Sequence, residues 1–335
     1  MRKPLLLLIF LLAPFTIQPD EIYVVKMGTL APEGSAWIDV WKKVVRDLEK
    51  ESKGRIKMIT YAGGVMGDEP EMVKKMRMGQ LNMGGFTING IKHIAPELLV
   101  LELPFLLRSW QEADYIKEKF FQRFSAYFEE KGFILLAIVD QGFIRFYSRY
   151  ELKSFEDLKK RKVWVWQGEP VMTATTTELF GVNPIYTTVP EVLPSLQTGL
   201  IDTIQTSPLA CVALQWCHLI KYLFDFDIRY EPAVIVMSKN TFDSTPDDLK
   251  EIHMKFTKKY VPDFLKLTRQ EQENSLKQLK KRGVIFVKPS DAEISELEKK
   301  AKEFWDETVK TGLFPKDLVK DIVSALEEYR KGKGK

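Results

Sequence analysis

The sequence predicts an α/β fold in two domains, and three observations support this prediction. The chain has 335 residues, 45% of them hydrophobic and 29% charged, which is typical of a globular protein large enough for two hydrophobic cores. Segments with strand character alternate with segments of helical spacing, as in a largely parallel sheet. An unusually long helical pattern then follows Pro246.

The first elements follow a strand, helix, strand order. Residues 22–27 and 56–61 are rich in β-branched or other apolar residues and predict strands, and a short strand is expected at 82–86. Asp68 and Glu71 form a capping-box pattern that opens a helix. An earlier helix is predicted by apolar side chains at helical spacing, namely Trp37, Val40, Trp41, Val44 and Leu48.

The second half continues the alternation and adds the long helix. Further strands are predicted at 133–138, 143–148, 162–166, 201–204 and 234–237, with a helix over residues 188–199. Apolar residues then recur at helical spacing over 246–282, where Pro262 is expected to bend the helix. A helix this long in a two-domain protein is expected to run across both domains.

The termini and the overall charge bear on compartment and partners. Arg2 and Lys3 precede a short apolar run, so residues 1–20 predict a signal peptide or an uncleaved N-terminal anchor, and an exported protein. The formal net charge is +4, and the tail 330–335 supplies much of it, which disfavours nucleic acid as a partner. The C-terminal segment 316–335 is expected to be a helix with a basic, solvated tail.

The residues that carry chemistry in enzymes are sparse and scattered. The three histidines lie far apart in the sequence, and no nucleophile, phosphate-loop or dinucleotide motif is present. The sequence therefore predicts a protein that is not an enzyme and that needs no cofactor or metal. Cys211 and Cys217 are six residues apart, about 600° of rotation on a helix, and are expected to be separate buried thiols.

Five local motifs together resemble one protein family. They occur at residues 63–69, 78–84, 103–106, 191–202 and 238–246. In this order they are similar to the DctP-type substrate-binding proteins of tripartite ATP-independent periplasmic (TRAP) transporters, over about residues 22–315. The resemblance implies a two-lobed α/β receptor that closes on one solute and delivers it to a membrane permease. It also implies that the long helix spans both lobes.

The resemblance implies a particular division of the chain. Lobe I is expected from residues 22–142 plus 231–252, and lobe II from residues 143–230 plus 284–315, with 246–282 as the connecting helix. Hinges are expected near Gly142 and Tyr230, where strands pass between the lobes.

This chain departs from the family pattern at its ligand-binding positions. Ile144 and Trp164 stand where arginines that bind a ligand carboxylate are usual, and Ser207 stands where asparagine is common. Arg145 adjoins the first position, but one step along a strand reverses the side chain. The residues predicted to bind ligand are Trp164, Ile144, Phe86, Val189, Ser207, Trp166, Gln167 and Leu209.

These departures favour an apolar or amphipathic solute, such as a fatty acid or another lipid-like molecule. A buried carboxylate without a partner costs several kcal/mol, whereas each buried methylene gains about 0.8 kcal/mol. Some family members that pair with a tetratricopeptide-repeat protein also lack the arginine, and this chain resembles that subset. The permease and possibly such a repeat protein are therefore the implied partners.

Other interpretations of the same residues remain open. Each tryptophan and each apolar site residue is also consistent with ordinary core packing, Gln167 with a solvated turn, and Asp68 with a helix N-cap. The protein could be a receptor for an ordinary organic acid bound through Arg145 or Lys239. It could also be a structural or interaction protein whose own tryptophans fill the pocket.

Overall fold

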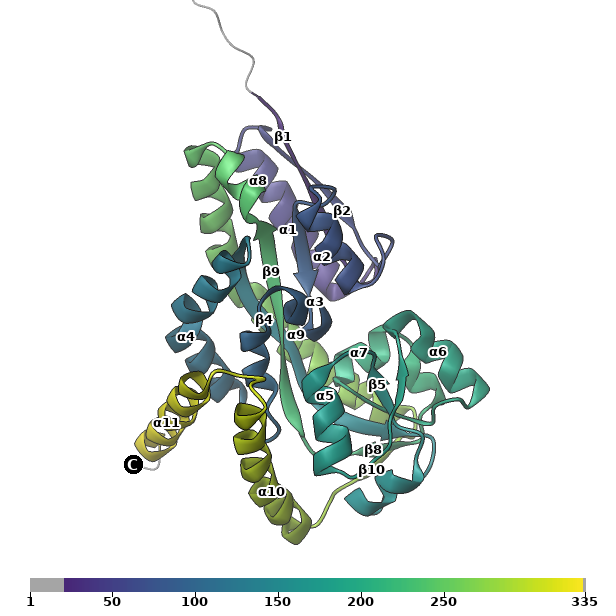
Figure 1. Ribbon diagram of the computed structural model, residues 1–335. Helices are drawn as coiled ribbons and strands as arrows, with labels where there is room; N and C mark the ends of the chain where they lie inside the picture. Colours follow the sequence, from purple (N-terminus) through teal and green to yellow (C-terminus); the bar gives the residue numbers. More distant parts are fainter. Residues whose placement is uncertain (1–20, 334–335) are drawn as a thin grey trace, which may run out of the picture.

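The computed structural model describes residues 21–333, so the predicted signal peptide or anchor at 1–20 lies outside the described residues. Two groups of strands and helices are joined by two long strands and one long helix (Figure 1). The predicted two-lobed α/β fold is confirmed. Among the helices of the described part, none combines the length and the hydropathy needed to cross a membrane.

The first lobe is a parallel arrangement of short strands with helices around it. β1 (Tyr23–Thr29) lies between β2 (Ile56–Tyr61) and β3 (Met83–Phe86), and both pairings are parallel. The helices of this region are α1 (Ala36–Glu51), α2 (Glu69–Arg77), α3 (Ile88–Ile94) and α8 (Lys239–Ser244). In α1 the buried residues Ile38, Trp41, Val44 and Leu48 form one apolar stripe, as the spacing predicts.

Two long strands pass from one lobe into the other. β4 (Phe133–Ser148) pairs antiparallel with β9 (Arg229–Ser238), and β9 also pairs antiparallel with β3. The predicted strands at 133–138 and 143–148 are therefore one continuous strand, and the prediction of a largely parallel sheet is wrong. The sheet is mixed because these two strands run in opposite directions through both lobes.

The two positions expected to be hinges lie on adjacent rungs of this ladder. Gly142 pairs with Glu231, and Phe143 pairs with Tyr230, next to a register shift between Asp140 and Gly142. Gly142 has a positive φ of 129°, a conformation that favours glycine. A Cβ at this position would lie 1.6 Å from Nε2 of Gln272, so no other residue fits there without a shift.

The second lobe continues β4 with shorter strands. The end of β4 pairs antiparallel with β7 (Thr203–Thr206) and β8 (Tyr222–Phe224), and β8 pairs parallel with β10 (Ile285–Val287). β5 (Trp164–Trp166) and β6 (Ile185–Thr187) form a separate parallel pair. The α-helices here are α5 (Pro170–Ala174), α6 (Val189–Thr198) and α7 (Pro208–Ala213). The chain also contains four short helical segments, η1 (Pro96–Glu102), η2 (Phe155–Lys160), η3 (Thr175–Leu179) and η4 (Trp216–Leu219).

The long helical pattern forms one helix, α9 (Asp247–Lys281), which continues through Pro262. Its buried residues recur at helical spacing and include Leu249, Phe256, Phe264 and Leu279. α9 contacts α1 in the first lobe, the shared strand β4 and α7 in the second lobe. The helix therefore spans both lobes, as expected.

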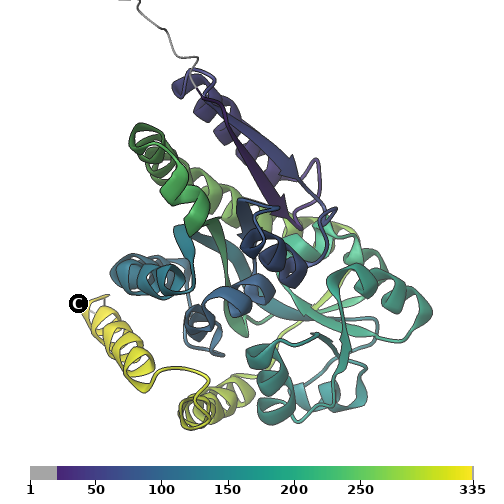
Figure 2. The same ribbon diagram turned by 45° about the horizontal axis from the view of Figure 1, so that its top comes forward.

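Three further helices cover the side of the molecule away from α6. α4 (Trp110–Glu130) and α11 (Lys316–Lys333) lie side by side in both views, and α10 (Asp291–Lys310) lies near the second lobe (Figures 1 and 2). Nε1 of Trp305 in α10 donates to the carbonyl of Pro104 at 2.9 Å. Arg330 forms an ion pair with Glu112 at 2.8 Å, so the expected solvated tail is anchored at this residue.

Candidate functional site

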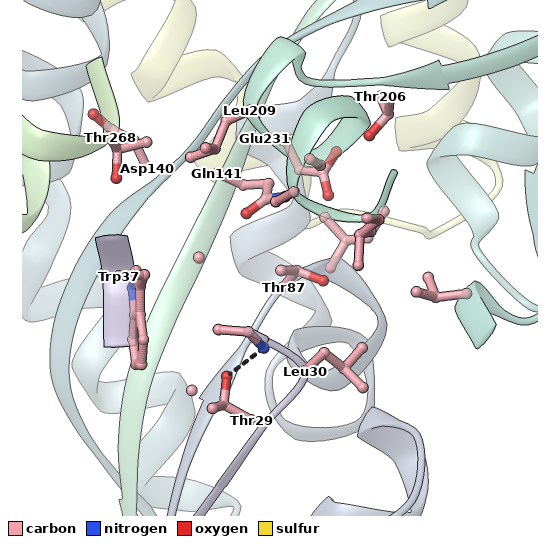
Figure 3. A pocket seen from close by; sticks show the side chains of 18 of the residues that line it. Thr29, Leu30, Trp37, Thr87, Asp140, Gln141, Thr206, Leu209, Glu231 and Thr268 are labelled. Atoms are coloured by element: carbon pink, nitrogen blue, oxygen red, sulfur yellow. Dashed lines mark hydrogen bonds between the residues drawn. The ribbon is translucent and has the colours of Figure 1, made fainter. Parts of the chain in front are cut away.

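A pocket lies where the two lobes, the shared strands and α9 meet. Its cavity volume is about 160 Å³. In Figure 3, Thr29, Leu30 and Thr87 of the first lobe lie on one side and Thr206 and Leu209 of the second lobe on the other. Gln141 of β4 and Glu231 of β9 lie between the two sides. The site is thus assembled from segments that are distant in the sequence.

Tryptophans form most of the wall on the second lobe. Trp164 and Trp166 are separated by one residue on β5, and their rings stack with centroids 6.5 Å apart. Trp216, from η4, meets Trp164 edge-on at 5.4 Å. Nε1 of Trp164 donates to the carbonyl of Thr187 at 3.2 Å, so the polar atom of this ring is satisfied within the wall. The remaining ring surface presents an apolar face to the pocket.

The first lobe contributes a second apolar wall. The loop after β1 and the start of α1 bring Leu30 and Trp37 to the pocket, and Phe86 follows from the end of β3. The Phe86 ring lies over Gly84 and Gly90, where an added Cβ would come within 2.2 Å and 2.6 Å of ring atoms. These glycines therefore allow the ring to lie against the first lobe and leave the cavity open.

The structure brings five of the eight predicted site residues to this pocket. They are Trp164, Trp166, Phe86, Val189 and Leu209. Whether they contact a ligand stays a prediction. The other three residues do not line the pocket, and each has a structural reason.

Ile144 is fully buried and lies beyond the lining part of β4, which ends at Gln141. Ser207 is the N-cap of α7, where its Oγ accepts a hydrogen bond from the backbone of Ala210 at 3.2 Å. Gln167 is an exposed residue directly after β5. The expectation that Ile144 and Trp164 face one cavity is therefore wrong.

One end of the pocket is polar and contains an arginine. Arg229 and Glu231 are separated by one residue on β9, and both line the cavity. The Arg229 guanidinium donates to Oε1 of Gln205 at 2.7 Å and lies 3.8 Å from the Glu231 carboxylate. Behind it, Glu102 is fully buried with its Oε2 3.6 Å from Nε of Arg229. Within residues 21–333, neither Glu102 oxygen has a hydrogen-bond partner.

Burial changes the acidity of the carboxyl groups at this end. It raises the pKa of Glu231 to about 7 and that of Glu102 well above its ordinary value, although Arg229 acts in the opposite direction on both. Burial likewise raises the pKa of Glu69, which also lines the pocket, to about 8. Near neutral pH the Glu231 carboxyl group can therefore either donate or accept a hydrogen bond.

Two polar contacts join the lobes beside the pocket. Nε1 of Trp166 donates to Oδ2 of Asp68 at 3.4 Å, while the other oxygen of Asp68 caps α2. Nζ of Lys92 in α3 donates to the carbonyl of Gly168 at 2.6 Å and lies 3.5 Å from the Glu169 carboxylate. The N-cap interpretation of Asp68 is confirmed, and Asp68 also contacts the tryptophan wall.

The two basic residues considered for an organic acid lie elsewhere. Arg145 is paired with Asp225 and Asp227, and Lys239 with Glu129 and Asp243. Neither lines the pocket. In the part of the chain that the structure describes, no group of histidine, cysteine and acidic side chains is arranged to hold a metal.

Sequence reasoning missed the polar end and two of the tryptophans. Arg229 and Glu231 are separated by one residue, and this i, i+2 spacing in a strand was a usable signal for a shared face. Trp37 and Trp216 reach the pocket only because α1 and η4 are folded toward it. No local pattern in the sequence distinguishes them from core residues.

A two-lobed α/β fold with a pocket between the lobes, lined from both, is typical of proteins that bind a small solute. Residues 27–311 match the family model DctP, described as bacterial extracellular solute-binding protein, family 7. The chain belongs to this family.

Relatives and solved structures agree with this assignment. Alignments with YiiZ of Salmonella typhimurium (28% identity) and a solute-binding protein of Verminephrobacter eiseniae (29%) cover 60% of this chain each, but only 62% and 60% of those relatives. The 2,3-diketo-L-gulonate-binding periplasmic protein YiaO of Escherichia coli is 25% identical over 73% of this chain and 74% of its own length.

The fold is shared with solved TRAP periplasmic solute-binding proteins. A structure from Haemophilus influenzae with bound L-gulonate superposes with a TM-score of 0.84 at 21% identity, covering 91% of this chain and 99% of the other. The sugar acid binding protein of Advenella mimigardefordensis, in complex with galactonate, gives 0.85 at 21% identity, with 92% and 99% covered. At this identity the likeness establishes the fold.

Proposed function

We propose that this protein is a periplasmic receptor of a TRAP-type transporter for an amphipathic solute, a fatty acid or a similar lipid-like molecule. One observation carries the proposal: three tryptophans, Trp164, Trp166 and Trp216, line the pocket as a continuous apolar wall. The apolar part of the solute lies against this wall, and its polar group lies at the end formed by Arg229 and Glu231.

The energetics of the two ends favour such a solute. Each methylene buried against the wall contributes about 0.8 kcal/mol, which is about fourfold in affinity. A polyhydroxylated solute placed against the same rings would leave hydroxyl groups without partners, at about 1–3 kcal/mol for each. The polar end offers the Arg229 guanidinium and the Glu231 carboxyl group as partners for the polar group of the solute.

A specific observation favours a second candidate, a receptor for an organic acid. Arg229 lines the pocket, and a guanidinium is a suitable partner for a carboxylate. The solved relatives from Haemophilus influenzae and Advenella mimigardefordensis contain L-gulonate and galactonate. Under this alternative Arg229, rather than Arg145 or Lys239, binds the acid.

The proposed receptor closes on its solute by bending at the ladder of β4 and β9. Gly142 and Tyr230 mark the hinge, lobe I comprises 22–142 plus 231–252, and lobe II comprises 143–230 plus 284–315. The contacts of Asp68 and Lys92 across the lobes support a closed form that a membrane permease recognises. A tetratricopeptide-repeat protein as a further partner stays a prediction, and co-purification from the native membrane tests it.

Chain-length dependence of binding separates the two candidates. Protein isolated from the periplasm without detergent is first analysed by native mass spectrometry for a retained molecule. Octanoate, decanoate, dodecanoate, L-gulonate and galactonate are then titrated by calorimetry. The amphipathic proposal expects affinity to rise with each added methylene, and weak or absent binding of the sugar acids. Tight binding of a sugar acid without any dependence on chain length would instead establish the organic-acid receptor.

A further inference from the structure

A chain of buried hydrogen bonds leads from η3 to the polar end of the pocket. Oγ1 of Thr176, in η3, donates to the carbonyl of Met172 at 2.7 Å. Nε2 of Gln205 donates to Oγ1 of Thr176 at 2.7 Å, and Oε1 of the same amide accepts from Nη1 of Arg229 at 2.7 Å. Thr176 is fully buried and does not line the pocket, whereas Gln205 and Arg229 both do. The chain thus connects a residue outside the pocket to the guanidinium within it.

The hydroxyl of Thr176 determines which way the Gln205 amide faces. A threonine hydroxyl has one hydrogen, and the carbonyl of Met172 accepts it, so Oγ1 can only accept from Gln205. The reversed amide would place its oxygen against an oxygen without a free hydrogen, and its NH₂ group against the N–H group of Arg229. Both contacts would leave buried polar groups unpaired, which is unfavourable. Oε1 of Gln205 is thereby held toward Arg229.

Arg229 is held at Nη1, whereas its Nε and Nη2 form no hydrogen bond within residues 21–333. The residue is only 1% exposed. Its Nε has no hydrogen-bond partner, although Oε2 of Glu102 lies 3.6 Å away, and its Nη2 lies 3.8 Å from Oε2 of Glu231. Both distances exceed those of a hydrogen bond. A buried guanidinium with unused donors beside a cavity is suited to an acceptor that a solute supplies.

We propose that Thr176 and Gln205 are positioning residues, which hold the Arg229 guanidinium for an acid group of the solute. This inference rests on the proposed function, and it applies to a fatty acid and to a sugar acid alike. The hydrogen bonds order the arginine before the solute arrives. Ordering a flexible side chain on binding lowers affinity by about 2- to 12-fold, and this is the gain expected for an acid. A neutral head group should gain less, because hydrogen bonds between charged partners are stronger.

Pairs of solutes that differ only in the head group measure this effect. Decanoate is compared with 1-decanol, and galactonate with galactitol, by calorimetric titration of the full chain. The acid selectivity is the Kd of the alcohol divided by the Kd of the matching acid. The parent chain should prefer the acid by about tenfold or more, as expected for a hydrogen bond between charged partners. The pair that binds identifies the class of solute, whereas the ratio within that pair reports on Arg229.

Thr176→Val removes the hydroxyl of a residue that does not line the pocket. It should lower the acid selectivity by about 2- to 12-fold. Thr176→Ser keeps the hydroxyl and should lower the selectivity less. Thr177→Val is the matched control, because Oγ1 of Thr177 donates to the carbonyl of Thr173 at 3.0 Å but lies outside the chain of hydrogen bonds to Arg229. This control should keep the selectivity of the parent, and circular dichroism shows whether each variant is folded.

A double-variant cycle tests whether Thr176 acts through Gln205. Gln205→Leu removes both hydrogen bonds of the amide and should itself lower the acid selectivity. In this background Thr176→Val should cause no further loss, because the connection to Arg229 is already broken. A further loss of similar size would show that Thr176 acts by another route and would refute the positioning role.

Three other results would overturn the inference. They are a parent chain without a preference for either acid, a folded Thr176→Val protein with the selectivity of the parent, and equal losses in Thr176→Val and Thr177→Val. If Thr176→Val does not fold, unchanged selectivity in Gln205→Leu gives the same refutation. A parent chain that binds no member of either pair would refute the proposed function and this inference together. Binding with a selectivity that does not depend on Thr176 would refute the positioning role alone.

Discussion

Replacing Trp164 with alanine tests whether the tryptophan wall binds the solute. Trp164 is only 3% exposed, its ring contacts Trp166 and Trp216, and its Nε1 is already bonded to Thr187. The substitution removes the ring in the middle of the wall. By the cost of large-to-small changes, dodecanoate binding should weaken by about 2–4 kcal/mol, or about 30- to 1000-fold in Kd.

The same substitution also costs folding stability, about 3–5 kcal/mol for a buried tryptophan. Calorimetric titrations are therefore made at a temperature where circular dichroism shows the variant to be folded. Trp305→Ala is the matched control, since Trp305 is 8% exposed and its Nε1 donates to the carbonyl of Pro104, but it does not line the pocket. It should lose comparable stability and keep its affinity.

A folded Trp164→Ala protein with unchanged affinity for dodecanoate would refute the proposed wall, provided that the parent chain binds this probe. Trp164 would then be a core residue. Trp164→Phe gives a further check, because it keeps part of the apolar area and should fall between the parent and the alanine variant. Equal affinity losses in Trp164→Ala and Trp305→Ala would also count against a direct contact, since they would show a general effect of stability.

Three other predictions concern packing and pH. Gly90→Ala should force the Phe86 ring to move, which should destabilise the protein by about 1–3 kcal/mol and weaken solute binding. Gly332→Ala is the control, because there is open space around this residue, and it should change neither the thermal melt nor the binding titration. Burial raises the pKa of Glu169 to about 7, so this group lowers the free energy of unfolding as pH rises from about 4.5 to 7. Glu169→Gln should remove on the order of 3 kcal/mol of that change. If urea unfolding shows the same dependence of stability on pH in the variant as in the parent, this prediction is refuted. Burial lowers the pKa of His253 to about 4, so the stability that its neutral imidazole contributes is present above about pH 6.5 and is lost as pH falls to 4. Over that interval His253→Gln should lose less stability than the parent in the same unfolding experiment.

The local elements of the fold could be predicted from the sequence because their patterns are local. The apolar stripe of α1 and the long pattern that becomes α9 depend only on helical spacing. The sheet could not be predicted in the same way. The course of β4 through Gly142 and its pairing with β9 join residues about a hundred positions apart, and Gly142 suggested an interruption where the structure has a bulge within one strand.

Part of the candidate site could be predicted, because some of the positions at which the family binds its ligand lie on regular strands. Trp164 and Trp166 share a face of β5, and strand parity places both at the pocket. The prediction failed at Ile144, because β4 has passed the pocket before it reaches that residue. The spacing of Arg229 and Glu231 indicates a shared strand face, but it does not show that this face lines the pocket. The burial of Arg229 depends on Gln205 of β7 and Glu102 of η1, which are distant in the sequence.

The passage of β4, β9 and α9 through both lobes has a consequence for how such a protein can change over generations. Neither lobe is a continuous stretch of the gene, so exchanging one lobe with a relative would require a junction in each of these three elements. Recombination is thereby a poor route to a new specificity. Substitutions that leave these three elements intact do not face this constraint.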